Sequence, residues 1–149
     1  MSNYCSLSPS VTSTLLAGST TSPFAVDVQI NQKLCKFVCT DGHTPVFNPT
    51  FSLVEYQNVS GTNYVATINV QGRIDYIPIN GSPCNPQSML VNVNFPIYFV
   101  SATAPTAVDI SLINTDNSMI PSTSTTGCAC YRSRHFLSDN VLTLTVTTA

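Results

Sequence analysis

Hydrophobic and polar residues alternate along most of the chain with a period of two, and the spacing of an amphipathic helix is nearly absent. The clearest alternation covers residues 64–76, where apolar side chains and Gly72 share one face and polar side chains share the other. Successive side chains of a β-strand point to opposite faces of its sheet. This segment therefore predicts a long, half-buried strand, kinked or bulged at Gly72.

A second long alternation runs from Met89 to Phe99 and contains Pro96. Because proline has no N–H to donate to a ladder, we expect this strand at a sheet edge or with a bulge at Pro96. Shorter or weaker patterns predict further strands around residues 24–30, 34–40, 50–56, 108–112 and 142–146. Turn-forming segments separate them: 18–23, 41–42, 45–49, 58–62, 80–86, 102–106 and the polar tract 114–127.

About eight short strands separated by turns are typical of two packed antiparallel sheets. We therefore predict an all-β fold, a two-sheet, jelly-roll-like β-sandwich, over residues 19–149. The first 18 residues are rich in Ser and Thr, and we expect them to form a flexible N-terminal arm that connects subunits in an assembly. Val11, Ser13, Leu15 and Ala17 alternate well enough for one strand within that arm.

The chain is poor in charge: only 8% of its residues are charged, and its net charge is -2. Soluble proteins average about 25% charged residues, so Ser, Thr, Asn and Gln must cover this surface. The few basic residues are scattered, which argues against a nucleic-acid partner. We also expect no membrane insertion, since no apolar run is long enough, and no classical signal peptide, since the N-terminus lacks that pattern.

Six cysteines carry most of the specific information: Cys5, Cys35, Cys39, Cys84, Cys128 and Cys130. Their connectivity does not follow from the sequence. One lies in the predicted arm and five lie in the body, and five cysteines cannot all pair with one another. If two bridges form within the domain, the fifth body cysteine is left for Cys5, and an arm that reaches a neighbouring copy makes that bridge intermolecular. Cys35, Cys39 and Cys84 are our candidates for bridges within the domain.

Two other interpretations of the cysteines stay open. In one, they are reduced and buried as small apolar side chains. In the other, a structural metal is bound by Cys35, Cys39 and His43, or by Cys128, Cys130 and His135. Ligands four residues apart on a strand lie about 13 Å apart, which disfavours the metal. We therefore predict no metal and no cofactor.

Catalytic chemistry has little support in the sequence. A nucleophilic cysteine needs an oriented base, and Cys130 with His135 is the one pair that we consider. The acidic residues are spread one per segment, without a pair suited to general acid–base catalysis. We expect no enzymatic activity. A binding module is a separate possibility, with a stacking platform drawn from Tyr56, Tyr64, Tyr76, Tyr98 and Tyr131, although strand packing is the default role of such tyrosines.

A short arm with Cys5, a compact body rich in Thr, Val and Asn, further body cysteines and no signal peptide together resemble the subunits of bacterial endospore appendages. The resemblance covers the whole chain as architecture. It implies a jelly-roll subunit whose arm lies on a neighbouring subunit and forms disulfides with it, in a fibre assembled inside the mother cell. Cys5 matches an arm cysteine, although that family's arm carries adjacent cysteines, and its partner would be Cys128 or Cys130.

These patterns lead to one function and one alternative. The expected function is a self-assembling structural subunit of an extracellular or spore-surface fibre, joined by strand augmentation at sheet edges and by disulfides through the arm. Its partners would be copies of itself, in a homopolymer such as a fibre or stacked rings. The alternative is a monomeric or oligomeric β-sandwich that binds a ligand or a carbohydrate.

Overall fold

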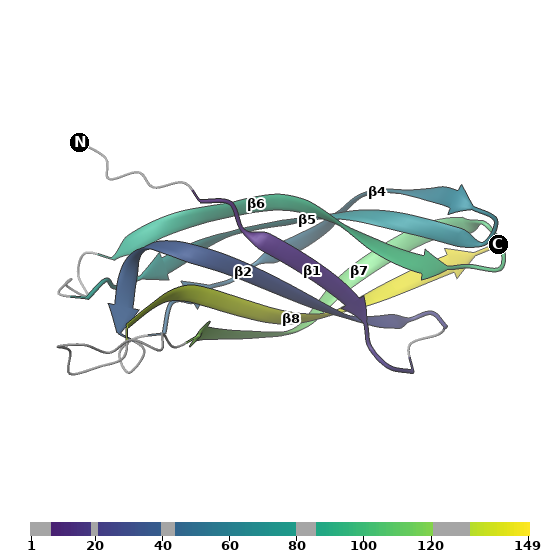
Figure 1. Cartoon of the computed structure of the whole chain (residues 1–149). Helices are drawn as coiled ribbons and strands as arrows, with labels where there is room; N and C mark the ends of the chain where they lie inside the picture. The colour runs from purple at the N-terminus through teal and green to yellow at the C-terminus, as the bar shows by residue number, and fades with distance from the viewer. Residues whose placement is uncertain (1–6, 19–20, 40–43, 80–85, 121–131) are drawn as a thin grey trace.

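Eight β-strands make up the regular structure of the chain (Figure 1). The computed structural model describes residues 7–18, 21–39, 44–79, 86–120 and 132–149. The strands are β1 (Ser10–Leu15), β2 (Phe24–Cys39), β3 (Val46–Phe47), β4 (Thr50–Ser60), β5 (Asn63–Tyr76), β6 (Gln87–Val100), β7 (Pro105–Ile120) and β8 (Arg132–Thr148).

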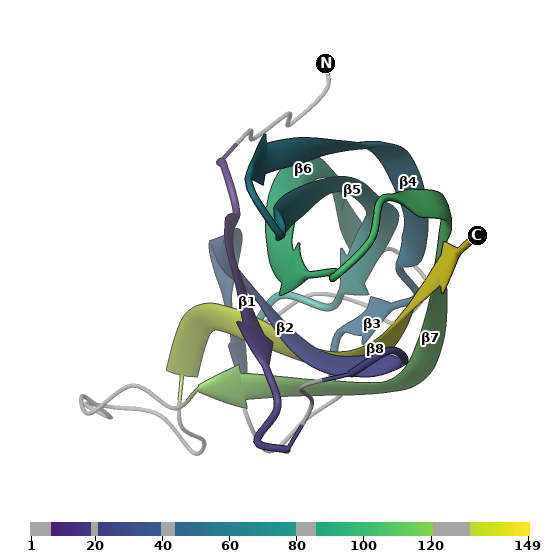
Figure 2. The same cartoon turned by 90° about the vertical axis from the view of Figure 1, so that its right-hand side faces the viewer.

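The strands form two antiparallel sheets, as the sequence predicts for a β-sandwich. Sheet A has the order β1-β2-β8-β7. In sheet B, β5 is central, with β6 on one side and β3 and β4 on the other. Seen end-on, the two sheets curl around a shared interior (Figure 2). Their edges meet where β1 contacts β6 and where β4 contacts β7. The all-β, two-sheet prediction is confirmed, and its jelly-roll detail stays a prediction.

The core lies between the inner faces of the two sheets. The face of β5 predicted to be buried is the inner one, and Ile68, Val70 and Ile74 have no exposed surface. Aromatic pairs connect the sheets across the core. The Phe47 and Phe136 rings meet edge-to-face with centroids 5.9 Å apart, and the Phe24 and Phe99 centroids lie 6.2 Å apart. Burial of these apolar side chains is the main stabilising term of such a fold.

The structure shows whether the strands are irregular at Gly72 and at Pro96, as the sequence suggested. Residues Asn63–Tyr76 of β5 pair with β6 without any register shift, so there is no bulge at Gly72 in that ladder. Gly72 instead makes room for the Phe47 ring, because a Cβ atom there would lie 2.5 Å from Phe47 Cε1. Pro96 marks an edge strand, as expected, since β6 pairs only with β5 among the described strands.

Several expected boundaries were wrong. The turn expected at 45–49 contains β3, and β4 extends to Ser60 inside the turn expected at 58–62. The polar tract 114–127 was expected to be a loop, but its residues up to Ile120 belong to β7 and pair with β8. The segments around 24–30 and 34–40 are one strand, β2, with an irregular register between Lys33 and Val38.

The interior beside the second half of β7 is polar, which explains why alternation of apolar residues does not reveal the strand. Asn117 Nδ2 donates to Phe47 O at 2.9 Å, and Thr115 Oγ1 donates to Asn140 Oδ1 at 2.8 Å. The adjoining residues Ser138, Asn140 and Gln32 have no exposed surface. The inward-facing positions therefore make hydrogen bonds where other strands use apolar contacts, although Asn117 Oδ1 and Gln32 Oε1 have no partner among the described residues.

The N-terminal segment contributes a strand of the domain. Residues Ser10–Leu15 of the predicted arm form β1 and pair with β2, so the alternation of Val11, Ser13 and Leu15 does mark a strand. Just before β1, Leu7 O accepts a hydrogen bond of 3.0 Å from Gln32 Nε2. Leu7 also packs against the core. Residues 1–6, with Cys5, lie outside the described residues.

Candidate functional site

The sheet edges differ in how regular they are. β1 is only 6 residues long, and the ladders of β4 and β7 with their neighbours contain register shifts, at Leu53/Glu55 and Leu112/Asn114 among others. β6 is 14 residues long and pairs with β5 without a shift. Bulges and short strands protect sheet edges from pairing with other chains. β6 is therefore the least protected edge in the described part of the chain.

The direction of the β6 backbone follows from two hydrogen bonds. Pro96 O accepts from Ser13 Oγ of β1 at 2.7 Å, on the side away from β5, and Ser101 N donates to Thr62 O at 2.9 Å, on the β5 side. In an antiparallel ladder, the N–H and C=O of one residue point to the same side, and the side alternates along the strand. Even-numbered residues of β6 therefore direct their backbone groups outward, and the N–H missing from Pro96 costs no bond to β5.

The same even-numbered residues expose apolar side chains near both ends of β6. Leu90 is 67% exposed, Tyr98 63% and Val100 57%. Asn92 and Asn94 lie between them, followed by Pro96. Long edge strands usually carry charged residues that discourage pairing, and β6 has none. We call the outward backbone groups and side chains of residues 88–100 the β6 edge.

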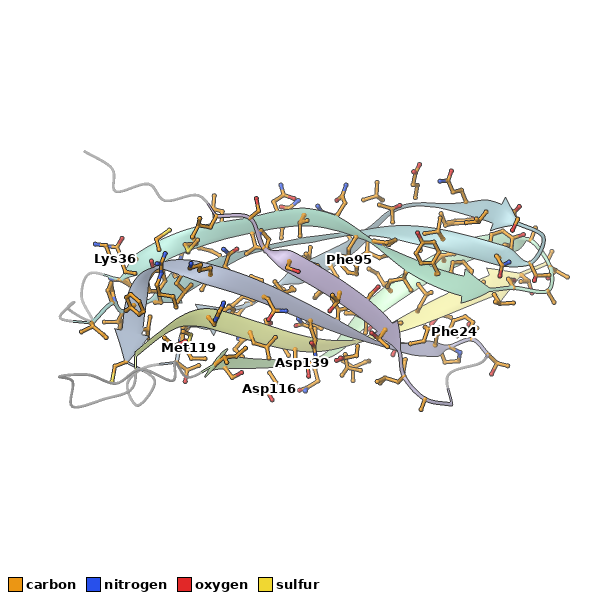
Figure 3. All side chains as sticks on the ribbon, in the orientation of Figure 1. Phe24, Lys36, Phe95, Asp116, Met119 and Asp139 are labelled. Carbon is orange, nitrogen blue, oxygen red and sulfur yellow. The ribbon has the colours of Figure 1, made fainter. Side chains whose placement is uncertain are left out.

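An apolar groove of about 600 Å³ adjoins the end of the β6 edge. It is lined mainly by Leu15, Phe24, Val59, Tyr64, Tyr98, Phe99 and Val100. Tyr64 stacks on Phe99 with ring centroids 5.7 Å apart. Phe24 lies toward the end of the molecule at which β6 finishes, whereas Phe95 lies nearer its middle (Figure 3). The exposed apolar surface of β6 thus continues into a groove between the two sheets.

A second groove, of about 510 Å³, lies on the outer face of sheet B. Most of its lining side chains carry amide or hydroxyl groups: Asn48, Thr50, Ser52, Asn69, Gln71 and Asn92. Gly72, Leu90 and Val91 complete the lining, and none of the nine residues is charged. We call this the amide groove. Sequence reasoning missed it, although Thr50, Ser52, Asn69, Gln71 and Asn92 occupy polar positions of strands that the sequence predicted.

The outer face of sheet A carries neighbouring carboxyl groups. Asp116 of β7 pairs with Asp139 of β8, and both lie on the lower side of the molecule in Figure 3. A hydrogen bond with Asp139, together with partial burial and repulsion from that carboxylate, raises the pKa of Asp27 to about 6. In the described part of the chain, no group of three His, Cys, Asp or Glu side chains is arranged to hold a metal ion.

The cysteines expected to form bridges are only partly described. Cys35 is half-buried on β2, with its Sγ atom 3.9 Å from Met89 Sδ. Neither Cys35 nor Cys39 is a free thiol. The remaining candidates lie outside the described residues: Cys5, Cys84, Cys128, Cys130 and, for the metal alternative, His43. Which cysteine bonds to which therefore stays a prediction. His135, the expected base for Cys130, is exposed on β8.

The tyrosines expected to form a binding platform occupy different environments. Tyr64 and Tyr98 both line the apolar groove. Tyr56 is half-buried on β4, and Tyr76 is 3% exposed, with a pKa raised by its burial. Tyr131 lies outside the described residues. The structure thus brings together two of the five tyrosines that the sequence offered.

No protein-family model, curated protein or solved structure matches this chain. Within the residues that the structure describes, no helix is long and apolar enough to cross a membrane. What the protein does must therefore be inferred from its own geometry.

Proposed function

We propose that the protein is a self-assembling structural subunit of an extracellular or spore-surface fibre, with no catalytic role. Copies would join by strand augmentation at the β6 edge and by disulfides through the N-terminal segment, in a jelly-roll-like subunit of the appendage type. The observation that carries the proposal is that β6 is a long, uncharged edge strand that pairs with β5 without a register shift and exposes Leu90, Tyr98 and Val100.

A strand from a second copy would use two stretches of this edge. β1 lies against β6 and its Ser13 Oγ donates to Pro96 O, so an incoming strand would pair with the residues on either side of Pro96. Each backbone hydrogen bond made there would contribute about 0.5–1.5 kcal/mol net. Covering the exposed apolar side chains would add about 25 cal/mol for each Å² removed from water. Several such contacts are enough for a weak strand-pairing interface that repetition along a fibre would strengthen.

The composition of the surface supports contact between identical chains. With 8% charged residues and a net charge of -2, copies repel one another little. Two of the described charges already pair with each other on the outer face of sheet B, where Arg73 Nε lies 2.9 Å from Asp75 Oδ1. Ser88 Oγ donates to the same carboxylate at 2.6 Å.

The covalent part of the proposal is limited by the reach of the chain. Gln32 holds Leu7 at the domain, and Cys5 precedes Leu7 by two residues, which span at most about 7 Å. A bridge from Cys5 would therefore require a neighbour to bring Cys128 or Cys130 close to this side of β2. The disulfide would fix a contact that strand pairing has already formed, because the two-residue spacing from Cys5 to Leu7 gives the thiol a short reach.

Electron microscopy and electrophoresis of the purified protein test both parts. We expect fibres or stacked rings in micrographs, and oligomers in non-reducing electrophoresis that collapse to monomer on reduction. Leu90→Pro removes an outward N–H without removing a bond to β5, so it should abolish assembly while the subunit stays folded. Leu90→Lys should act similarly by placing a charge at the edge.

Val54→Lys is the matched control, because Val54 is a 53% exposed apolar residue at the register shift of β4, another sheet edge. It should leave assembly unchanged. Assembly of both Leu90 variants at the wild-type rate would rule out the β6 edge. A monomer in both electrophoresis lanes would rule out the disulfide part.

A further inference from the structure

The amide groove on the outer face of sheet B shares Leu90, Val91 and Asn92 with the β6 edge, but strand pairing at β6 uses the backbone and leaves open the part of the groove that β4 and β5 form. We infer that this groove binds a neutral oligosaccharide. Its volume of about 510 Å³ falls within the roughly 300–1,000 Å³ of small-molecule sites. The inference rests on the arrangement of hydrogen-bonding groups and on the absence of charge in the lining.

Strand register arranges these groups as two parallel rows across the sheet. One row is Ser52, Asn69 and Asn94, and the other is Thr50, Gln71 and Asn92, each running from β4 through β5 to β6. Neighbouring strands lie about 4.8 Å apart, and same-face residues on one strand lie about 6.8 Å apart. The outer face therefore presents a grid of neutral side chains, each of which can hydrogen-bond a hydroxyl group.

The amides of the grid are held in a fixed orientation. Asn69 Nδ2 donates to Asn92 Oδ1 and to Asn94 Oδ1, both at 2.8 Å. Both amide hydrogens of Asn69 are used in this way, so its Oδ1 atom is the acceptor that it offers to a ligand. Asn92 and Asn94 accept through oxygen and therefore offer their NH₂ groups as donors. Because these positions are set before binding, little conformational entropy is lost when a ligand arrives.

This combination matches the chemistry of sugar hydroxyls. A hydroxyl both donates and accepts, and it is best bound by a donor and an acceptor side by side, as Asn69 Oδ1 and the neighbouring NH₂ groups provide. The lining contains no Lys, Arg, His, Asp or Glu. A phosphate or carboxylate ligand would find no counter-charge there. Leu90, 67% exposed at the rim, offers an apolar contact for the C–H face of a sugar ring.

Calorimetric titration of the intact protein with maltotriose, cellotriose and triacetylchitotriose tests the inference. We expect at least one of these neutral trisaccharides to bind with a dissociation constant of about 1 mM or lower. Gln71→Ala should weaken that binding at least tenfold. Gln71 is exposed, so the variant should fold like the wild type. Asn69→Ala should weaken binding at least as much, because it removes the residue that orients both neighbouring amides.

Asn114→Ala is the matched control, an exposed asparagine on β7 of the other sheet, and it should bind like the wild type. If none of the three trisaccharides binds, or if Gln71→Ala and Asn69→Ala bind as tightly as Asn114→Ala, the groove is not a glycan site. The titration is carried out at a protein concentration at which light scattering detects no assembly, so a second copy cannot cover Leu90. Failure to form fibres and failure to bind sugar are therefore separate results.

Discussion

Phe47 occupies the space that a side chain at position 72 would need. A Cβ atom at Gly72 would lie 2.5 Å from Phe47 Cε1 and 3.2 Å from two further ring atoms. Phe47 is itself 1% exposed and packs edge-to-face on Phe136 of the opposite sheet. The two-residue strand β3 can thus pack against β5 because Gly72 leaves room for the Phe47 ring.

Gly72→Ala should therefore destabilise the protein by about 1–3 kcal/mol, the usual cost of overpacking a core. The Phe47 ring must shift, and its contact with Phe136 shifts with it. Urea denaturation followed by circular dichroism measures the change. Gln71→Ala, at the adjacent exposed position, should stay within about 0.5 kcal/mol of the wild type. Equal stability of the two variants would show that the ring relocates without cost.

Asn117→Ala should also destabilise the protein, by about 1–3 kcal/mol. The substitution leaves Phe47 O without its hydrogen bond in a buried setting, and an unsatisfied buried acceptor costs about that much. Ser118→Ala is the control, since Ser118 is the next residue and is exposed. Thermal and urea unfolding should separate the two variants, and indistinguishable curves would show that this contact between β7 and β3 adds nothing.

The pKa of Asp27, raised to about 6 from 3.8, predicts how stability depends on pH. A raised pKa means that the folded state binds this proton more tightly than the unfolded state does. The stabilisation is complete below pH 3.8 and is lost as pH rises through 6. Urea titrations at pH values between 4 and 7 should show this loss in the wild type and a flatter profile in Asp27→Asn. Asp109→Asn, at an exposed carboxylate on β7, should keep the wild-type profile.

Ser13→Ala should speed up assembly if the β6 edge is the assembly surface. Ser13 Oγ is the donor to Pro96 O that links β1 to β6, and one hydrogen bond is worth about 0.5–1.5 kcal/mol. Losing it should expose more of the edge and raise the rate up to about tenfold, as measured by light scattering. Thr12→Ala, the exposed neighbour on β1, should assemble at the wild-type rate. A slower Ser13→Ala variant would mean that β1 helps to build the contact.

Some parts of this structure could be predicted from the sequence because local pattern and environment agree. Along β5, inward residues are apolar and outward residues are polar at almost every position, and along β6 the inward residues are all but uniformly apolar, so period-two alternation finds both strands. Pro96 identified an edge without knowledge of the neighbouring strands. The second half of β7 was not predicted, because its inward-facing Thr115 and Asn117 are polar and donate hydrogen bonds to Asn140 and Phe47, which lie far away in sequence.

The candidate sites could not be predicted from local patterns, because they depend on strand register and on the direction of the backbone at the sheet edge. The contact of Asn69 with Asn92 and Asn94 exists because of the register between β5 and β6, and a long connection from Tyr76 to Gln87 leaves that register open. The outward direction of the backbone at Leu90 likewise follows from hydrogen bonds at Pro96 and Ser101. Sequence alone indicated polar and apolar positions on these strands, but not which of them meet.

The polar interior beside β7 helps to fix the register of β7 against β8 in sheet A. Sliding β7 by two residues along β8 would keep every side chain on its own face, so apolar contacts alone would tolerate the shift. The hydrogen bonds would not tolerate the shift. Thr115 would lose its bond to Asn140 and Asn117 its bond to Phe47 O, and the acceptors would be left without these donors inside the protein. Burial of aliphatic side chains in one half of the sandwich stabilises the contact between the sheets. The hydrogen bonds in the other half favour the observed register of β7 and β8 over a shifted one.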